Sequence, residues 1–248
     1  MCRHLAYLGP PVALAALLYD PPQSLLRQSW APRRQRYGTV NADGYGVGWY
    51  QPDVRPEPAR YRRAGPMWAD RSLESLAGVV RSGAFLAAVR SATPPAPIEE
   101  TGAAPFTDGR WLFSLNGVVH TDLVALRQQL SARRQAALTG SSDSELLFAL
   151  LLDRLDTDDP ASAVADLVAT VPGRLNLLLT DGSTIWATSH GDTLAWRTAP
   201  GGGVVVASEP LDDGPEWIAV PDDFSVIATA DGTSMVPLTA PAKGDASS

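Results

Sequence analysis

The chain has 248 residues, of which 45% are hydrophobic and 19% charged, and its formal net charge is −7. This composition is typical of a folded globular protein and excludes a disordered or fibrous chain. The negative charge argues against nucleic acid or an anionic membrane as partner, because binding to either needs clustered Lys and Arg.

The single cysteine, Cys2, directly follows Met1. Removal of Met1 would put a thiol and a free α-amine on one residue, and an N-terminal amine, with a pKa of about 7.7 to 8.0, can act as the base for that thiol. The alternative is a small buried hydrophobe in a first strand. One Cys excludes an intramolecular disulfide. Because His4, His120 and His190 are far apart in the sequence, we expect neither a metal nor a cofactor.

The apolar run at 11–18 is short and bounded by prolines, so we assign it to the fold rather than to a signal peptide. No apolar run reaches the roughly 20 residues that span a bilayer, and we expect a cytoplasmic protein. The densest basic run, at 33–36, is interpreted as a solvated loop. The block at 41–50 has three glycines at alternate positions, which favours a turn into a strand over a nucleotide-binding loop. Such glycines would also let another group approach the backbone closely.

Short apolar runs bounded by Gly, Pro or Asp predict buried strands at 85–89 and 111–115. Later runs form pairs around hairpin-type turns, which predicts meander-like antiparallel sheet. These pairs are 175–180 with 184–189, 193–198 with 204–208, and 227–230 with 234–238.

Helical spacing of apolar residues predicts helices at 122–130 and 161–170. A further helix opens at Ser142, with Glu145 at capping-box spacing ahead of the apolar run at 146–152. A helix that is apolar on most sides needs cover on most sides, which indicates helices layered on sheets. We expect a single domain, residues 1–240, and a flexible tail, residues 241–248.

Polar residues stand at the ends of the predicted strands. Arg90 can fork two hydrogen bonds onto a carboxylate or can form a plain salt bridge. Asn116 and Gly117 offer a side-chain amide and a backbone N–H, two donors for an oxyanion, although Asn-Gly is also a common turn dipeptide. Asp143 can bind a cation or can stabilise the N-terminus of its own helix.

The chain resembles the class II glutamine amidotransferases, which are N-terminal-nucleophile hydrolases, in the order and spacing of several motifs. These are Cys2, the Asn-x-Asp-Gly-Tyr-Gly block at 41–46, Arg90-x-x-Thr93, Asn116-Gly117 and the segment 142–145. The segment 206–217 is similar to the late Ser-Glu-Pro segment of that family, so the resemblance covers nearly the whole chain. It implies an α+β fold, a four-layer αββα sandwich of two antiparallel sheets covered by helices.

The resemblance also implies an activity. Cys2 would be the nucleophile, its freed amine the base, and Asn116 with the Gly117 N–H the oxyanion hole. The thiolate would attack the γ-carbonyl of a γ-glutamyl amide, release an amine and leave a γ-glutamyl thioester for water to cleave.

The same resemblance implies a grip on the glutamyl head group. Arg90 and Thr93 would bind its α-carboxylate, and Asp143 would bind its α-ammonium. Two departures from the family argue against free glutamine as the preferred substrate. Members that hydrolyse glutamine often have His two residues before the Arg and an Asn-x-His-Pro segment beyond it, whereas this chain has Ala88 and Gly-Ala-Ala-Pro at 102–105. There is also no second domain to consume ammonia.

The opening segment 1–9 is most similar to the branch of this family that acts in ergothioneine biosynthesis. That resemblance implies a hydrolase that removes glutamate from γ-glutamyl-hercynylcysteine S-oxide, a small-molecule substrate, without an obligate protein partner. Tyr45, Trp49 or Trp68 is a candidate wall for the leaving group, because an aromatic face attracts a trimethylammonium cation. Two alternatives stay open: a glutaminase subunit that supplies ammonia to a separate synthase, and a non-catalytic binding domain of the same fold.

Overall fold

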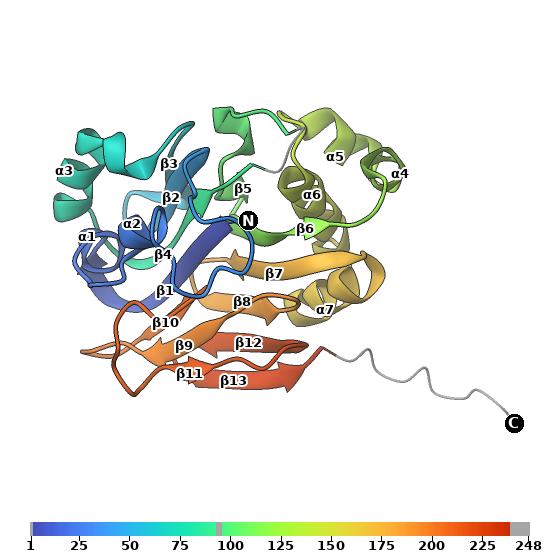
Figure 1. Cartoon of the computed structure of the whole chain (residues 1–248). Helices are drawn as coiled ribbons and strands as arrows, with labels where there is room; N and C mark the ends of the chain where they lie inside the picture. Colours follow the sequence, from blue (N-terminus) through green and yellow to red (C-terminus); the bar gives the residue numbers. More distant parts are fainter. Residues whose placement is uncertain (1, 93–95, 239–248) are drawn as a thin grey trace, which may run out of the picture.

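The computed structural model describes residues 2–92 and 96–238. Two antiparallel sheets lie face to face, and helices cover the outer face of each sheet (Figure 1). This arrangement confirms the predicted α+β fold with four layers. Met1, Thr93 and the predicted tail at 241–248 lie outside the described residues.

Within the described residues, the first sheet has seven strands in the order β11-β9-β10-β1-β4-β2-β3. Strand β1 lies in its interior, between β10 and β4, and its register sets Cys2 opposite Arg90. The strands are β1 Cys2–Ala13, β2 Gly44–Gln51, β3 Arg55–Arg63, β4 Arg81–Arg90, β9 Ala195–Thr198, β10 Val204–Ala207 and β11 Ile218–Ala219.

The second sheet has, in the described part of the chain, six strands in the order β13-β12-β8-β7-β6-β5. Its strand β6 pairs with β7 over Leu112–Val119 but with β5 only over Trp111–Phe113. The strands are β5 Phe106–Asp108, β6 Trp111–Val119, β7 Gly173–Thr180, β8 Thr184–Ser189, β12 Phe224–Thr229 and β13 Gly232–Pro237.

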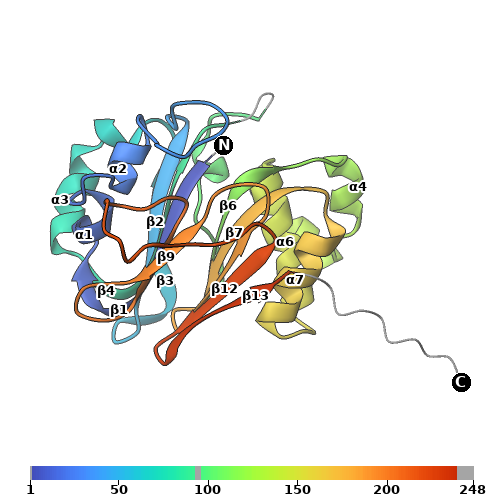
Figure 2. The same cartoon turned by 60° about the horizontal axis from the view of Figure 1, so that its bottom comes forward.

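One group of helices covers the first sheet and a second group covers the second sheet, as the rotated view also shows (Figure 2). The first group is α1 Ala15–Leu18, α2 Leu25–Gln28 and α3 Arg71–Val79, and the second is α4 Leu123–Gln128, α5 Ala132–Ala137, α6 Asp143–Leu155 and α7 Pro160–Thr170. Short 3-10 turns lie at Met67–Ala69 and Glu100–Gly102. Among the described residues, no helix has the length and apolar composition needed to cross a membrane.

The predicted hairpins are confirmed as β7-β8, β9-β10 and β12-β13, but they do not form one continuous meander. After β8 the chain crosses to the first sheet for β9 and β10, and β12 then returns to pair with β8. Alternation within a strand predicts which residues share a face, but it does not identify the neighbouring strand. This crossing brings the β8-β9 connection next to the beginning of β1.

The helix predicted at 122–130 is shorter in the structure and begins after Asp122, whose side chain accepts a hydrogen bond from the Val124 N–H. Only one of the two hydrogen bonds of the predicted capping box forms. The hydroxyl of Ser142 accepts the N–H of Glu145 as expected, whereas the Glu145 carboxylate binds the N–H groups of Thr139 and Gly140 instead of reaching back to Ser142. The N-terminus of α6 is therefore tied to the loop that precedes it.

The apolar core has three parts, one between the sheets and one under each group of helices. Between the sheets lie Leu86, Leu112, Leu178 and Val206, all with 0% exposure. Burying a side chain of this size stabilises the fold by about 1.5–3 kcal/mol. At the end of this inner layer where β1 begins, buried polar and charged residues replace the aliphatic ones.

The alternate glycines of β2 lie on its inner face. A Cβ atom at Gly46 would come 2.5 Å from the carbonyl oxygen of Ala104, and one at Gly48 would come 2.6 Å from the Leu112 side chain. Only residues without a side chain let the two layers approach this closely. The prediction that these glycines permit close approach to the backbone is confirmed.

Candidate active site

Four elements bring predicted site residues to one cavity. Cys2 begins β1, Arg90 ends β4, Gly117 lies in β6 and Asp143 begins α6, and all four line a cavity of about 430 Å³. Cys2 is a free, partly exposed cysteine. It therefore faces a cavity and is not the fully buried small hydrophobe that was the alternative interpretation.

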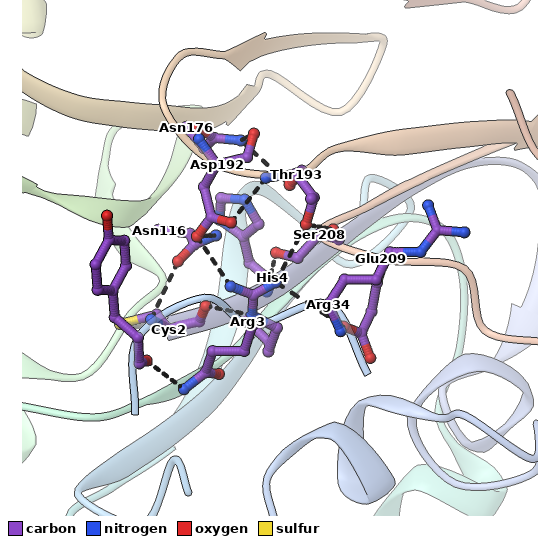
Figure 3. Close-up of polar contacts among 12 residues, drawn as sticks. Cys2, Arg3, His4, Arg34, Asn116, Asn176, Asp192, Thr193, Ser208 and Glu209 are labelled. Atoms are coloured by element: carbon purple, nitrogen blue, oxygen red, sulfur yellow. Dashed lines mark hydrogen bonds and ion pairs between the residues drawn. The ribbon is translucent and has the colours of Figure 1, made fainter. Parts of the chain in front are cut away.

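Asn116 lies beside the nucleophile candidate. The backbone nitrogen of Cys2 donates a hydrogen bond to Oδ1 of Asn116 at 3.1 Å, and Nδ2 of Asn116 donates to Oδ2 of Asp192 at 3.3 Å (Figure 3). This backbone nitrogen is the atom that becomes the α-amine when Met1 is removed. An amide NH₂ group carries two hydrogens, so Asn116 keeps one beyond the bond to Asp192.

The N–H of Gly117 points away from β7. Leu175 lies opposite Gly117, yet its own N–H donates to the carbonyl of His190 and its carbonyl accepts the Thr188 hydroxyl. Residues of an antiparallel pair alternate between exchanging both backbone bonds and exchanging neither. Gly117 and Leu175 form a pair of the second kind, and the Gly117 N–H is directed to the opposite edge of β6.

That opposite edge of β6 faces the cavity. Strand β5 pairs with β6 no further than Phe113, and the N–H of Val119, two residues beyond Gly117, donates to Oδ2 of Asp143 at 3.4 Å. Backbone groups two residues apart in a strand point the same way. The Gly117 N–H and the Asn116 amide are thus two adjacent donors, which is the arrangement that stabilises an oxyanion. No side chain fits at Gly117, because its Cβ would collide with the Arg174 carbonyl.

Arg90 is 8% exposed and is held at the wall of the cavity. Its Nη1 donates to the carbonyl of Pro97 at 3.1 Å, and its guanidinium packs so closely on Gly102 that a Cβ there would lie 2.9 Å from Cζ. Arg62 donates to the carbonyls of Thr101 and Ala103 and so fastens this segment. Thr93, the predicted partner of Arg90, is outside the described residues.

Asp143 contributes the opposite charge to the same cavity. Its Oδ1 accepts the N–H of Ser144 at 2.8 Å, and its Oδ2 accepts that of Val119. A cavity with a guanidinium, a carboxylate and a thiol suits a molecule that carries both an α-carboxylate and an α-ammonium.

Sequence reasoning missed the buried charges behind Cys2. The Arg3 side chain has 0% exposure; its Nε donates to the Cys2 carbonyl at 2.8 Å, and its Nη2 donates to Asp192 Oδ2 at 3.0 Å. Its Nη1 lies 4.0 Å from Oε2 of Glu209. Asp192 had no local signal, since it lies in the β8-β9 connection. Glu209 belongs to the Ser-Glu-Pro segment, but no role had been assigned to it.

Glu209 also holds the loop that follows α2. One carboxylate oxygen accepts the backbone N–H of Arg33 at 2.9 Å, and the other accepts that of Arg34 at 2.7 Å. Gln23 donates a further bond to the same carboxylate. The loop interpreted from its arginines as solvated is therefore anchored through its backbone, while the Arg33 side chain forms an exposed ion pair with Asp213.

His4 is fully buried, and its Nδ1 lies 3.1 Å from the Ser114 hydroxyl. Burial, and to a smaller extent the positive charge of Arg3, lowers the pKa of His4 from 6.5 to about 3. The imidazole is neutral at pH 7. His4 thus packs inside the fold as a neutral residue.

The three aromatic residues predicted as a leaving-group wall are not among the residues that line the Cys2 cavity in the described structure. Tyr45 donates its hydroxyl to Asp70, and Trp68 packs edge-on against Trp30 with ring centroids 5.8 Å apart. The cause is the alternation of β2: its glycines occupy the inner face, so Tyr45 and Trp49 face the helices on the other side.

Nowhere in the described residues do three or more His, Cys, Asp or Glu side chains gather in a way that could hold a metal ion. The charged groups behind Cys2 form an ion pair instead, Arg3 with Asp192.

Comparisons with known proteins identify the family of the chain. The model of the family described as glutamine amidotransferases class II matches residues 17–234. The gamma-glutamyl-hercynylcysteine sulfoxide hydrolase of Mycolicibacterium smegmatis is 45% identical over 223 residues, which are 90% of this chain and 93% of that protein. The protein of the same name from Mycobacterium tuberculosis is 44% identical over 96% of this chain and 97% of its own length.

Among solved structures, a glutamine aminotransferase class-II domain protein from Silicibacter pomeroyi is 27% identical and superposes with a TM-score of 0.72, covering 96% of this chain and all of that one. Motifs, fold and relatives agree along nearly the full length, and the chain belongs to the class II glutamine amidotransferases.

Proposed function

We propose that this protein cleaves the γ-glutamyl amide of γ-glutamyl-hercynylcysteine S-oxide and releases glutamate and hercynylcysteine S-oxide, a step of ergothioneine biosynthesis. The main support for the proposal is that one cavity is lined by Cys2, Arg90, Gly117 and Asp143. The relatives that match nearly end to end are named for this substrate. We assign the reaction to the cytoplasm, because the lone thiol must stay reduced.

The glutamyl head group is held by charge. Arg90 binds the α-carboxylate, with Thr93 as its proposed second donor, and Asp143 binds the α-ammonium. Two charged contacts of opposite sign set the orientation of the substrate and direct its γ-carbonyl to the Cys2 thiol. The support for these roles is that Arg90 and Asp143 both line the cavity that Cys2 opens into.

The reaction needs the α-amine that removal of Met1 exposes. This amine takes the proton of the Cys2 thiol, and the thiolate attacks the γ-carbonyl carbon. The negative charge that develops on the carbonyl oxygen is stabilised by the second amide hydrogen of Asn116 and by the Gly117 N–H. The tetrahedral adduct collapses as its C–N bond breaks, and the leaving amine takes the proton held by the α-ammonium of Cys2.

The γ-glutamyl thioester is then hydrolysed. The neutral α-amine accepts a proton from water, the hydroxide attacks the thioester carbon, and the C–S bond breaks as the thiolate is reprotonated. Glutamate leaves and the free thiol is restored. The same groups serve both halves of the reaction, and no further reactant is consumed besides water.

The test compares glutamate release from γ-glutamyl-hercynylcysteine S-oxide and from glutamine, using protein shown by intact mass to lack Met1. We expect kcat/KM for the sulfoxide to exceed that for glutamine by at least about 10²-fold, because the enzyme must recognise the leaving amine. Efficient cleavage of glutamine alone would favour a subunit that supplies ammonia to a synthase. Processed protein that cleaves neither compound would favour a non-catalytic binding domain.

A further inference from the structure

A buried ion pair lies directly behind the nucleophile. The side chains of Arg3 and Asp192 have 0% exposure, and Nη2 of Arg3 lies 3.0 Å from Oδ2 of Asp192. That same carboxylate oxygen accepts Nδ2 of Asn116, and Nε of Arg3 donates to the Cys2 carbonyl (Figure 3). Arg3 therefore contacts the main chain of Cys2 and, through Asp192, the amide of Asn116.

The chemistry of these partners determines the orientation of the Asn116 amide. A carboxylate only accepts hydrogen bonds, so Asn116 must direct its NH₂ group to Asp192. The nitrogen of Cys2 is a donor, so Asn116 must direct its oxygen there. Both requirements select the same one of the two flipped amide orientations. That orientation leaves the second N–H, rather than the carbonyl oxygen, available to an oxyanion.

We propose that Arg3 and Asp192 are positioning residues for catalysis. Asp192 orients the Asn116 amide as an oxyanion donor, and the positive charge of Arg3 stabilises the buried Asp192 carboxylate. An unpaired anion beside the developing oxyanion would oppose the reaction. Arg3 neutralises it and at the same time holds the Cys2 main chain. This inference rests on the proposed function, because it assigns these residues to the same acyl-transfer step.

Asp192 is itself fixed, as a positioning residue must be. Its N–H donates to Oδ1 of Asn176 at 3.1 Å, and Nδ2 of Asn176 donates to the Asp192 carbonyl at 2.9 Å. The other carboxylate oxygen, Oδ1, accepts the N–H of Thr193 at 2.7 Å. Asn176 lies opposite Asn116 in the register of β6 and β7. One asparagine of this cross-strand pair holds the β8-β9 connection, and the other approaches Cys2.

The test replaces Asp192→Asn and Arg3→Lys, with Arg134→Lys as the matched control in a second buried arginine. Turnover is measured on γ-glutamyl-hercynylcysteine S-oxide and on γ-glutamyl-p-nitroanilide, whose leaving group differs. Alkylation of Cys2 by iodoacetamide is measured alongside, because this reaction uses the thiol but forms no oxyanion. All proteins are first shown by intact mass to lack Met1.

We expect Asp192→Asn to lower kcat on both substrates by about 10- to 100-fold, less than the loss of a whole oxyanion donor, with KM and the alkylation rate changed by less than about threefold. The side chain introduced at position 192 can both donate and accept, so it no longer selects one orientation of Asn116. Arg3→Lys retains the charge but not the planar fork, and we expect a smaller fall in kcat. Arg134→Lys should lower the melting temperature and leave kcat unchanged.

Wild-type kcat in a folded Asp192→Asn variant would overturn the proposal. Parallel losses of kcat and alkylation rate would also overturn it, since they would indicate a merely structural role. If the wild-type enzyme cleaves the anilide but not the sulfoxide, the assigned leaving group is wrong. The positioning role is then tested by the kcat of the variants on the anilide. Wild-type protein that cleaves neither substrate would overturn both proposals.

Discussion

Two buried arginines, Arg3 and Arg134, have similar burial but different surroundings. Arg134 is 4% exposed and lies near Asp108, Asp153 and Asp156, at 2.6, 3.4 and 3.1 Å, and the side chains of these acids remain 40%, 25% and 54% exposed. Arg3 pairs with Asp192, whose side chain has 0% exposure. Water therefore reaches the acids of the Arg134 cluster but not the acid that faces Arg3.

This difference indicates why each charge is retained. The free-energy cost of desolvating a fully buried ion pair often exceeds the Coulomb attraction between its charges. A contribution to stability alone therefore does not explain why Arg3 and Asp192 are present. The Arg134 cluster keeps much of its hydration and joins α5 to β5 and to the end of α6. We interpret Arg134 as a brace of the fold, and Arg3 as part of the apparatus around Cys2.

The largest expected effect is at Cys2. Cys2→Ala removes the thiol, retains the α-amine after processing, and should lower the rate of glutamate release by at least about 10⁴-fold, because the thioester can no longer form. The melting temperature should stay close to that of the wild type, since Cys2 is partly exposed. Measurable turnover in this variant, with intact mass excluding contamination by the wild-type chain, would contradict the assignment of the catalytic region.

Asp143 and Asp156 lie at opposite ends of α6, and the same substitution at each should have different effects. Asp143→Asn removes the charge assigned to the substrate ammonium, and kcat/KM should fall by about 10- to 100-fold, mainly through KM, because a hydrogen bond to a charged group contributes about 1.5–3 kcal/mol. The control is Asp156→Asn at the other end, where Asp156 binds Arg134. That change should reduce stability by less than about 1 kcal/mol and leave KM unchanged.

The catalytic region should also be sensitive to acid. His4 has its pKa lowered to about 3 in the folded protein, so between pH 6.5 and 3 the unfolded chain binds a proton that the folded chain does not. The free energy of unfolding should therefore fall on acidification, by roughly 1.5 kcal/mol from this group between pH 6.5 and 5. Denaturant titrations of His4→Asn should show a shallower dependence on pH.

The matched control for that titration is His120→Asn, because His120 is exposed. It should keep the wild-type dependence on pH. An unchanged slope in His4→Asn would mean that other groups dominate the acid response and that the buried imidazole is not the cause.

The smallest effect is expected at Trp68, which is 42% exposed and packs on Trp30 away from the Cys2 cavity. Trp68→Ala should change KM for the sulfoxide substrate by less than about twofold, since surface substitutions away from a site have small effects. A large rise in KM, without a change in the KM for the anilide, would return this residue to the wall that contacts the leaving group.

Local motifs made much of the site predictable. Cys2, Arg90 and Asp143 each stand at the beginning or end of an element, where residue type and position together indicate chemistry, and Asn116 with Gly117 forms a recognisable dipeptide within β6. Asp192 could not be predicted in this way. Its partner Arg3 is 189 positions away, and only the crossing of the chain between the sheets brings the two residues together. No local pattern reports such a contact.

The fold also has parts that could be predicted from local sequence patterns and parts that could not. The apolar strands and hairpins were predictable from alternation and turn residues, whereas β3, Arg55–Arg63, was not, because its arginines and prolines resemble a loop. As the edge strand of its sheet, β3 tolerates this composition. The aromatic wall shows how alternation can be used further: placing the β2 glycines against the opposite sheet would already have assigned Tyr45 and Trp49 to the other face.

The carboxylate of Glu209 accepts the main-chain N–H groups of Arg33 and Arg34, not their side chains. Every amino acid except proline offers the same N–H, so the anchor does not depend on which residues the loop carries. In a saturation library, positions 33 and 34 should accept many replacements but exclude proline, whereas position 209 should accept few. The loop beside the site is thus free to change its side chains, and with them its contacts, while its attachment to the fold is preserved.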